Sequence, residues 1–247
     1  GQAASDEMGE ILQILSQGEI KLYGLVPWSS NYTFLTKIIA QAGELTAIYK
    51  PSRGMQPLWD FDAYTLCFRE VAAYKLGVFL GWPTIPPVIL REGPYGIGSL
   101  QLFIEHDLHI HYFTLRDDKH HVPAFQRIAL FDYLANNADR KGGHLLQDTA
   151  RGQIWAIDHG LTFHTDYKLR TVIWEHAGQP IPDDCLASIQ ALHDILSIAN
   201  SPLATALNEL LTVDEIEATR ERAGRLLQTR KFPRPRPSWH NVPYPLI

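Results

Sequence analysis

Two charged side chains in the first half of the chain stand where they could bind phosphate. Within residues 45–51, the alternation of a strand places Lys50 on the same face as Thr46 and Ile48. Twenty residues later, Glu70 lies in a helical pattern whose face is otherwise apolar, so its carboxylate requires a cation. A lysine on a strand is usually solvated, which is the ordinary explanation of Lys50. A strand lysine held by a helix glutamate, however, is suited to binding the α- and β-phosphates of a nucleotide.

Two aspartates in the second half could act on a phosphoryl group. Asp139 lies in the polar, glycine-containing stretch 137–144, which follows an apolar helical pattern and is typical of a loop. Its carboxylate could orient an acceptor hydroxyl and take the hydroxyl proton. Asp158 follows an apolar strand pattern, with Gly160 soon after it to let the chain turn, and such a carboxylate can bind Mg²⁺. Either aspartate alone could equally cap a turn or a helix, but the order of all four residues favours phosphoryl transfer.

The elements that must position these residues change in kind along the chain. In the first half the patterns predict a helix at 6–17, strands at 20–26, 32–40 and 45–49, a helix at 62–80 and strands near 87–90 and 98–103. After Asp107 they predict helices at 123–136 and 183–200, two helices within 203–227, and a hairpin of 144–147 with 153–157.

This order of elements predicts an α+β protein with a bilobal protein-kinase-like fold. We expect a small antiparallel sheet with one helix in the N-lobe, residues 1–105. The C-lobe, residues 106–229, is expected to be mostly helical and to carry both aspartate loops. Residues 230–247 are expected to form a proline-rich basic tail that is packed on the domain, left mobile, or in contact with an anionic membrane or substrate.

The composition limits the remaining classes of function. The 247 residues carry 22 Lys and Arg against 27 Asp and Glu, a net charge of −5, so no overall field attracts nucleic acid. The 2 cysteines, Cys67 and Cys185, are too few for a disulfide framework. No stretch is long and apolar enough to cross a membrane, and no basic segment followed by an apolar run marks a secretory signal. We therefore expect a cytoplasmic protein with no transmembrane segment and no nucleic-acid partner.

Three short motifs resemble those of a known enzyme family. They are Tyr49-Lys50-Pro51, Asn137-Ala138-Asp139-Arg140 and Ala156-Ile157-Asp158-His159-Gly160-Leu161. Together they resemble the lysine, catalytic-loop and metal motifs of phosphatidylinositol 3-/4-kinase-like atypical kinases, in particular the type II phosphatidylinositol 4-kinases. The second motif is also similar to that of HipA-type serine kinases. The resemblance extends from about Gly18 to Phe163.

The resemblance implies an ATP-dependent kinase that uses Mg²⁺ or Mn²⁺ and transfers the γ-phosphate to a hydroxyl of a protein, a lipid or a small molecule. It assigns phosphate binding to Lys50 and the support of that lysine to Glu70. It places Asp139 and the adjacent Arg140 in the catalytic set, and it gives Asp158 to the metal. The hinge that contacts adenine, largely through backbone groups, would consist of Phe103, Ile104 and Glu105.

Two positions depart from the family pattern. Where these kinases have an asparagine that helps to bind a second metal, this chain has His144, whose imidazole prefers softer ions than Mg²⁺. The phosphate-binding loop lacks glycine, so hydroxyl, amide and backbone groups of Ser29, Ser30 and Asn31 would cradle the phosphates instead. Both departures keep open an alternative, a catalytically inactive pseudokinase that binds nucleotide and acts as a binding or signalling module.

The 11 histidines raise a further alternative, a metalloenzyme. On a strand, His109 and His111 would share one face, as zinc ligands can. No third ligand stands at a recognisable spacing, so solvated loop histidines are the simpler explanation.

Overall fold

The computed structural model describes residues 2–26, 32–53 and 58–247, so the expected phosphate-cradle residues Ser29, Ser30 and Asn31 lie outside the described residues. The chain divides into two compact units. The first consists of Gly1–Tyr74 and Pro86–Ile104, and the second of Lys75–Ile85 and Glu105–Ile247. The strands that precede residue 105 belong to the first unit, and the hairpin and the later helices belong to the second.

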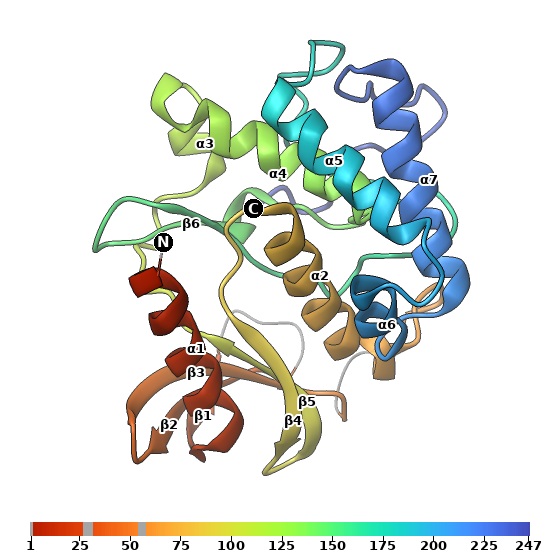
Figure 1. The fold of residues 1–247 in the computed structure, drawn as a ribbon. Coiled ribbons are helices and arrows are strands. Elements are labelled where there is room, and N and C mark those ends of the chain that lie inside the picture. The colour runs from red at the N-terminus through yellow and green to blue at the C-terminus, as the bar shows by residue number, and fades with distance from the viewer. Residues whose placement is uncertain (1, 27–31, 54–57) are drawn as a thin grey trace. The chain divides into compact units, whose positions relative to one another are not determined.

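The first unit is an antiparallel sheet with a helix on one face (Figure 1). Its strands lie in the order β1-β2-β3-β5-β4 and are β1 (Glu19–Leu25), β2 (Phe34–Ala40), β3 (Gly43–Pro51), β4 (Val88–Gly93) and β5 (Gly96–Leu102). Helix α1 (Gln2–Gln17) places Ile14 and Leu15 in one core with Ile38, Ala47, Tyr49 and Leu100 of the sheet. The predicted strands are confirmed, and α1 begins earlier than the sequence pattern indicated.

The alternation of side chains along β3 separates this core from a second face. Tyr49 points toward α1, so Ile48 and Lys50 lie on the opposite face. Across the strand pair, Lys50 stands opposite Ser99 and Ile48 opposite Gln101, and directly paired residues share a face. The face away from α1 is therefore the one that presents the predicted phosphate-binding lysine.

Helix α2 (Leu66–Leu80) carries the predicted glutamate, and both of its ends follow sequence signals. Asp62 accepts a hydrogen bond from the backbone N–H of Tyr64 at 3.0 Å and caps a short 3₁₀ turn, Ala63–Thr65, that leads into the helix. The helix ends before Gly81, whose φ of 76° is left-handed. The helix therefore ends at residue 80, as the sequence pattern predicted.

The second unit is mostly helical and carries a two-stranded hairpin (Figure 1). Its helices are α3 (Tyr112–Leu115), α4 (Val122–Leu134), α5 (Asp183–Leu196), α6 (Pro202–Asn208) and α7 (Val213–Thr229), and its hairpin is β6 (Leu145–Gln147) with β7 (Ile154–Ala156). Helices α5 and α7 pack against each other, and Arg222 of α7 donates to the carbonyl of Leu134 at the end of α4 at 2.7 Å. The two helices predicted after α5 are confirmed, one capped by Ser201 and the other by Thr212.

The proline-rich tail lies against the second unit. Trp239 donates from Nε1 to the carbonyl of Leu169 at 2.9 Å. Near the end of the chain, the carbonyl of Leu246 accepts from the N–H of Gly142 at 2.7 Å, so the tail contacts the stretch 137–144. Of the states that the sequence left open, the packed tail is the one observed.

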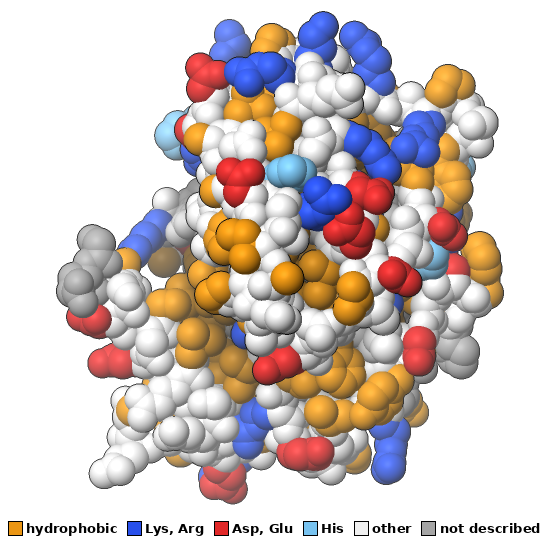
Figure 2. All heavy atoms as spheres, turned by 45° about the vertical axis from the view of Figure 1, so that its right-hand side comes forward, with side chains coloured by type: hydrophobic (Ala, Val, Ile, Leu, Met, Phe, Trp, Pro, Cys, Tyr) orange, Lys and Arg blue, Asp and Glu red, His pale blue; other side chains and the backbone are white. Residues whose placement is uncertain are grey.

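Among the described residues no helix is both long and apolar enough to cross a membrane. On the face drawn in Figure 2, basic side chains gather mainly along the upper edge, and acidic side chains are spread over the rest of the face. Along α7 charged side chains form pairs, with Arg220 Nε 2.9 Å from Glu217 and Arg225 Nη2 3.4 Å from Glu221. Ion pairs of this kind on the exposed side of a helix are typical of a solvated surface.

Candidate active site

In the first unit the predicted phosphate-binding lysine meets its predicted partner. Nζ of Lys50, at the end of β3, lies 3.1 Å from Oε1 of Glu70 on α2. Both side chains are shielded, with 17% of Lys50 and 6% of Glu70 exposed. A shielded ion pair adds little stability, because the desolvation of both charges offsets their attraction. The pair therefore fixes the position of the ammonium group more than it stabilises the fold.

In the second unit the loop that carries Asp139 is anchored by a buried ion pair. Asp132 of α4 and Arg140 are fully buried, and the guanidinium donates from Nε to Oδ2 at 2.8 Å and from Nη2 to Oδ1 at 3.0 Å. A bidentate pair of this kind fixes orientation as well as distance. Asn137 extends the anchor, since its Nδ2 donates to Asp132 at 3.0 Å and its Oδ1 accepts from the N–H of Asp139 at 3.0 Å. The loop is therefore held in place before any ligand binds.

Arg140, which the sequence placed in the catalytic set, reaches three segments of the second unit. Besides its contacts with α4, its Nη1 donates to the carbonyls of Ile157 at 2.8 Å and His144 at 3.3 Å, and its Nη2 lies 2.6 Å from Nε2 of His159. These contacts engage every nitrogen of the guanidinium. The geometry therefore gives Arg140 the properties of a positioning residue, which holds the loop and the chain around Asp158 in register.

Asp139 lies in an environment that disfavours its charge. Burial, reinforced by the negative charge of Asp158, raises the pKa of the Asp139 carboxyl from an ordinary value of 3.8 to about 6. The positive charges of Lys141, Arg140 and Arg170 act in the opposite direction but do not cancel the rise. A carboxylate whose pKa lies closer to neutrality is better suited to accept a proton during a reaction.

His144 joins the Asp139 loop to Asp158. Its Nδ1 lies 2.9 Å from the backbone carbonyl of Asp139, and its Nε2 lies 3.2 Å from Oδ2 of Asp158. Asp158 has a left-handed backbone, with a φ of 60°, and 36% of its side chain is exposed. The two predicted metal ligands are therefore neighbours in the second unit.

The ring proton of His144 has two possible positions. If Nδ1 carries it, Nδ1 donates to the carbonyl of Asp139, and the lone pair of Nε2 faces the carboxylate of Asp158. These two lone-pair donors repel each other unless a cation lies between them or the ring gains a second proton. If Nε2 carries it, Nε2 donates to Asp158, and Nδ1 accepts from the N–H of Lys141 at 3.3 Å. With the proton on Nδ1, the ring makes the shorter hydrogen bond, and Nε2 of His144 and a carboxylate oxygen of Asp158 could bind one metal ion together.

The predicted hinge residues directly follow β5. The N–H of Phe103 donates to the carbonyl of Thr46 on β3 at 2.9 Å, which continues the sheet beyond the end of β5. Ile104 is buried and ends the first unit. Glu105 begins the second unit, where its carbonyl accepts from the N–H of Thr149 at 3.0 Å. Backbone hydrogen bonds thus fix the two ends of the segment.

Comparison with known protein families identifies the class to which this geometry belongs. Residues 21–201, about three quarters of the chain, match the sequence profile of the family described as phosphatidylinositol 3- and 4-kinase. The chain belongs to this family. The membership inferred from the three motifs is thereby confirmed. This kinase-family chain is also 37% identical to Protein Rv2133c of Mycobacterium tuberculosis strain H37Rv over 265 residues, an alignment that covers 94% of each chain.

Two solved kinases are similar in fold to this family member. The Golgi casein kinase, in crystals with Mn/ADP bound and in a second structure, is similar with TM-scores of 0.58 and 0.56 and 14% identity. These alignments cover 92% and 94% of this chain and 76% and 81% of the other. The Helicobacter pylori proinflammatory kinase CtkA is similar with a TM-score of 0.50 and 12% identity, over 88% of this chain and 94% of that one. At such identities the likeness concerns the fold, and it confirms the predicted bilobal kinase-like α+β architecture.

The histidines do not form a zinc centre in the part of the chain that the structure describes. Within it, no three His, Cys, Asp or Glu side chains gather as a metal-binding group. His111 precedes α3 and lies edge-on to the ring of Phe113. His144 and Asp158, the two predicted metal ligands, lie 3.2 Å apart as a pair.

The ion pair that anchors the Asp139 loop was not predicted from the sequence, although the sequence around Asp132 indicates one of its two members. Asp132 stands between Phe131 and Tyr133 in the apolar helix α4, and a single carboxylate in such a run indicates a buried partner. Spacing could not identify that partner as Arg140, because the chain leaves the helix through Asn136, whose φ of 52° is left-handed.

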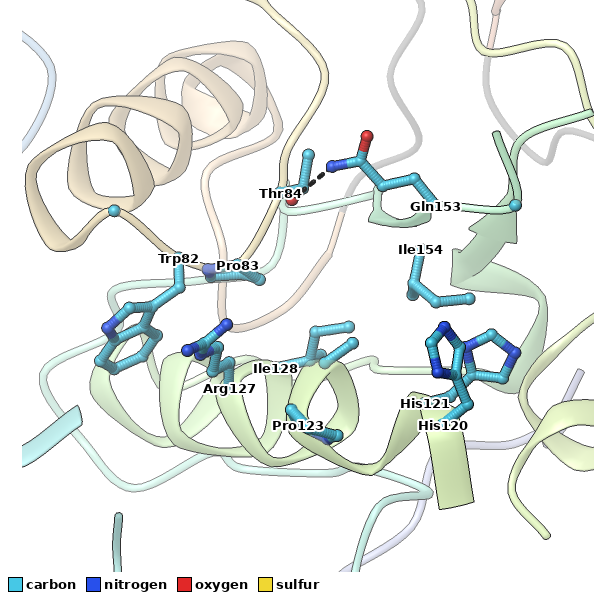
Figure 3. A pocket seen from close by; sticks show the side chains of 13 residues that line it. Trp82, Pro83, Thr84, His120, His121, Pro123, Arg127, Ile128, Gln153 and Ile154 are labelled. Carbon is cyan, nitrogen blue, oxygen red and sulfur yellow. Dashed lines mark hydrogen bonds between the residues drawn. The ribbon is translucent and has the colours of Figure 1, made fainter. Parts of the chain in front are cut away.

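A pocket of about 280 Å³ in the second unit contains none of the predicted site residues (Figure 3). Thr84 and Gln153 meet on one side through a hydrogen bond of 3.1 Å, and Ile128 of α4 lies across from them. His120 and His121 stand together at one end. The residues that the family motifs indicate therefore lie outside this pocket.

Proposed function

We propose that this protein transfers the γ-phosphoryl group of ATP to a hydroxyl of a protein, a lipid or a small molecule. The observation that carries the proposal is the contact of 3.1 Å between Lys50 and Glu70, because protein kinases need this ion pair to hold the phosphates of ATP. Membership of the phosphatidylinositol 3- and 4-kinase family supports the same class of reaction.

The proposed reaction gives a separate task to each side chain. Lys50 binds phosphate oxygens while Glu70 keeps the ammonium group in place. The acceptor hydroxyl attacks the γ-phosphorus, so that a new oxygen–phosphorus bond forms, the bond to the bridging oxygen of ADP breaks, and the hydroxyl proton passes to Asp139. Arg140 does not touch the reacting atoms, and acts by holding the Asp139 loop against Asp132 of α4.

Two further segments are proposed to complete the nucleotide site. Backbone groups after β5 contact adenine, and these belong to Phe103, Ile104 and Glu105. Hydroxyl, amide and backbone groups between β1 and β2 cradle the phosphates, and these belong to Ser29, Ser30 and Asn31, outside the described residues. The groups assigned in these two segments are hydroxyl, amide and backbone groups without positive charge, so Lys50 supplies the positive side chain assigned to the phosphates.

Asp158 and His144 are proposed to hold the divalent ion. A carboxylate oxygen suits Mg²⁺ and Mn²⁺ alike, whereas an imidazole nitrogen prefers softer ions than Mg²⁺. The Golgi casein kinase, which has a similar fold, was crystallised with Mn/ADP. We therefore propose that this pair works better with Mn²⁺ than with Mg²⁺.

Calorimetric titration with ATP, in the presence of Mg²⁺ or Mn²⁺, and an assay of labelled phosphate transfer test the proposal. We expect ATP binding that requires a divalent ion, together with autophosphorylation or phosphate release. Lys50→Met should abolish binding, whereas Asp139→Asn should bind ATP and lose transfer. Lys37→Met is the matched control, because Lys37 on the neighbouring strand β2 pairs at 2.8 Å with the exposed Glu44 and has no assigned role.

The two measurements separate the proposed kinase from its alternative. ATP binding that depends on Lys50, without any transfer by the unmodified protein, would favour the nucleotide-binding pseudokinase. A lack of ATP binding with either ion, or equal binding by Lys50→Met and the unmodified protein, would overturn the nucleotide site itself.

A further inference from the structure

Gln101 is a polar side chain buried in the sheet of the first unit. It lies on β5 opposite Ile48 of β3, next to the pair formed by Ser99 and Lys50. Directly paired residues share a face, and the alternation along β3 turns this face away from α1. Only 8% of Gln101 is exposed. Its amide is therefore placed on the same side of the sheet as the lysine proposed to bind phosphate.

The amide of Gln101 lacks a hydrogen bond that its surroundings would normally provide. Its Nε2 is buried and has no hydrogen-bond partner within the described ranges of the chain. Another buried polar side chain of the same sheet is satisfied, since the hydroxyl of Thr36 donates to the carbonyl of Ala47 at 2.8 Å. A buried donor without an acceptor is unfavourable and uncommon in native proteins. The Nε2 group thus lacks an acceptor that a ligand on this face could supply.

We propose that Gln101 recognises the base of the bound nucleotide and selects adenine. This inference rests on the proposed function, in which Lys50 binds the phosphates. By strand geometry, the Cα atoms of Gln101 and Lys50 lie about 8 Å apart, two residues along and one strand across. The ribose of a nucleotide can span this separation, so a phosphate at Lys50 brings the base toward Gln101.

The hydrogen-bonding groups of glutamine match one edge of adenine. Nε2 donates to N7 of the base while Oε1 accepts from the amino group at N6, the pairing that glutamine makes with adenine in DNA recognition. Guanine presents acceptors at both N7 and O6, so its O6 would face Oε1 with no hydrogen between them. A bidentate pair of this kind discriminates between bases by about 5- to 150-fold in Kd. Gln101 should therefore favour ATP over GTP by a factor in that range.

Calorimetric titrations of the full chain with ATP, 7-deaza-ATP and GTP, each with Mn²⁺, test the inference without any substitution. 7-deaza-ATP keeps the amino group but has a C–H in place of N7, so it removes the acceptor for Nε2. We expect a Kd for GTP that is about 5- to 150-fold higher than that for ATP, and a smaller increase for 7-deaza-ATP, which loses one of the two hydrogen bonds.

Two variants show whether Gln101 is the source of this selectivity. Gln101→Met keeps the length of the side chain but removes the amide, and should bring the three Kd values close together. It should also raise the melting temperature of the free protein, because it removes a buried donor that lacks an acceptor. Gln13→Met, on the solvent side of α1, is the matched control and should leave all ratios unchanged.

The possible results distinguish a failure of the proposed role of Gln101 from a failure of the proposed kinase function. Binding of ATP that is lost in Lys50→Met, but with equal Kd values for ATP and 7-deaza-ATP, would overturn the role of Gln101 and leave the kinase proposal standing. Selectivity that persists unchanged in Gln101→Met would also overturn it, since the base would then be read by another group. Failure to bind any nucleotide would overturn both.

Discussion

Replacing Asp139 by asparagine should stabilise the free protein while it abolishes phosphate transfer. The amide resembles the neutral carboxylic acid in shape but carries no charge, so it removes the group whose ionisation the site disfavours. At the same time it cannot take the proton of an acceptor hydroxyl. Gain of stability with loss of function is expected where a site holds a group in an unfavourable state for its chemistry.

The expected size of the gain follows from the pKa of Asp139. Burial, with the charge of Asp158, raises that pKa from 3.8 to about 6. At about 1.4 kcal/mol for each unit, the ionised carboxylate destabilises the fold by about 3 kcal/mol at neutral pH. Water penetration and relaxation reduce this value, so we expect a gain of about 1–3 kcal/mol in the free energy of unfolding. For a chain of this size the gain corresponds to roughly 2–8 °C in Tm.

The gain should appear within a defined range of pH. Because the folded-state pKa of Asp139 lies above its unfolded-state value, the unmodified protein loses stability as the pH rises from 3.8 through about 6. Asparagine does not titrate. The difference in stability between the two proteins should therefore be small below about pH 4, about half complete at pH 5 and constant above pH 7.

Thermal melts of both proteins between pH 4 and pH 8, with a chelator to remove metal ions, measure this difference. Asp148→Asn is the matched control, for which we expect a change in stability of the opposite sign. Desolvation disfavours the charge of Asp148, but hydrogen bonds from the side chain of Trp155 and from backbone N–H groups outweigh it and lower the pKa of Asp148. Asp148→Asn should therefore destabilise the protein at neutral pH. An equal Tm for Asp139→Asn and the unmodified protein at pH 7.5, or a gain that is the same at every pH, would refute the reasoning.

Other substitutions test the ion pairs and the metal site. Lys50→Met should lower the Tm, because the buried carboxylate of Glu70 loses the ammonium group of Lys50. The double variant Lys50→Met, Glu70→Gln should regain the Tm of the unmodified protein, but calorimetry should still show no ATP binding. His144→Asn should shift the metal preference of phosphate transfer from Mn²⁺ toward Mg²⁺. Asp158→Asn should remove the metal dependence of ATP binding. Metal titrations identical to those of the unmodified protein would contradict both assignments. Arg140→Met should lower the free energy of unfolding in urea by about 3–5 kcal/mol, because it leaves a buried carboxylate unpaired, and a loss below about 1 kcal/mol would show that the anchor is not needed.

The contact between Lys50 and Glu70 could be predicted because each residue belongs to a regular element. Period two along β3 gives the face of the lysine, and the apolar surroundings of the glutamate on α2 require a cation. Neither inference needs the tertiary structure. The resemblance to the kinase family then paired the two residues, and the observed distance of 3.1 Å confirms that contact.

Contacts that depend on irregular backbone could not be predicted in the same way. Between Asp132 and Arg140 lies Asn136, whose φ of 52° is left-handed, and neither periodicity nor spacing specifies the path of the chain through such a residue. The place of Gln101 could not be predicted for a different reason. The strand that contains it was predicted, but its position opposite Ile48 depends on the register between β3 and β5, which are separated in the sequence by α2 and β4.

Binding of a divalent ion at the proposed metal site should change how strongly the fold disfavours the charge of Asp139. The negative charge of Asp158 contributes to the raised pKa of Asp139, and His144 contacts both residues. A divalent cation bound by Asp158 and His144 would replace that negative charge by a net positive one, and so would bring the pKa of Asp139 back toward its ordinary value. Asparagine at position 139 cannot respond to the ion in this way. Saturating Mn²⁺ should therefore stabilise the unmodified protein more than Asp139→Asn and shrink their difference in Tm at pH 7.5. A difference that Mn²⁺ leaves unchanged, although calorimetry shows that the ion binds, would place the ion away from Asp158.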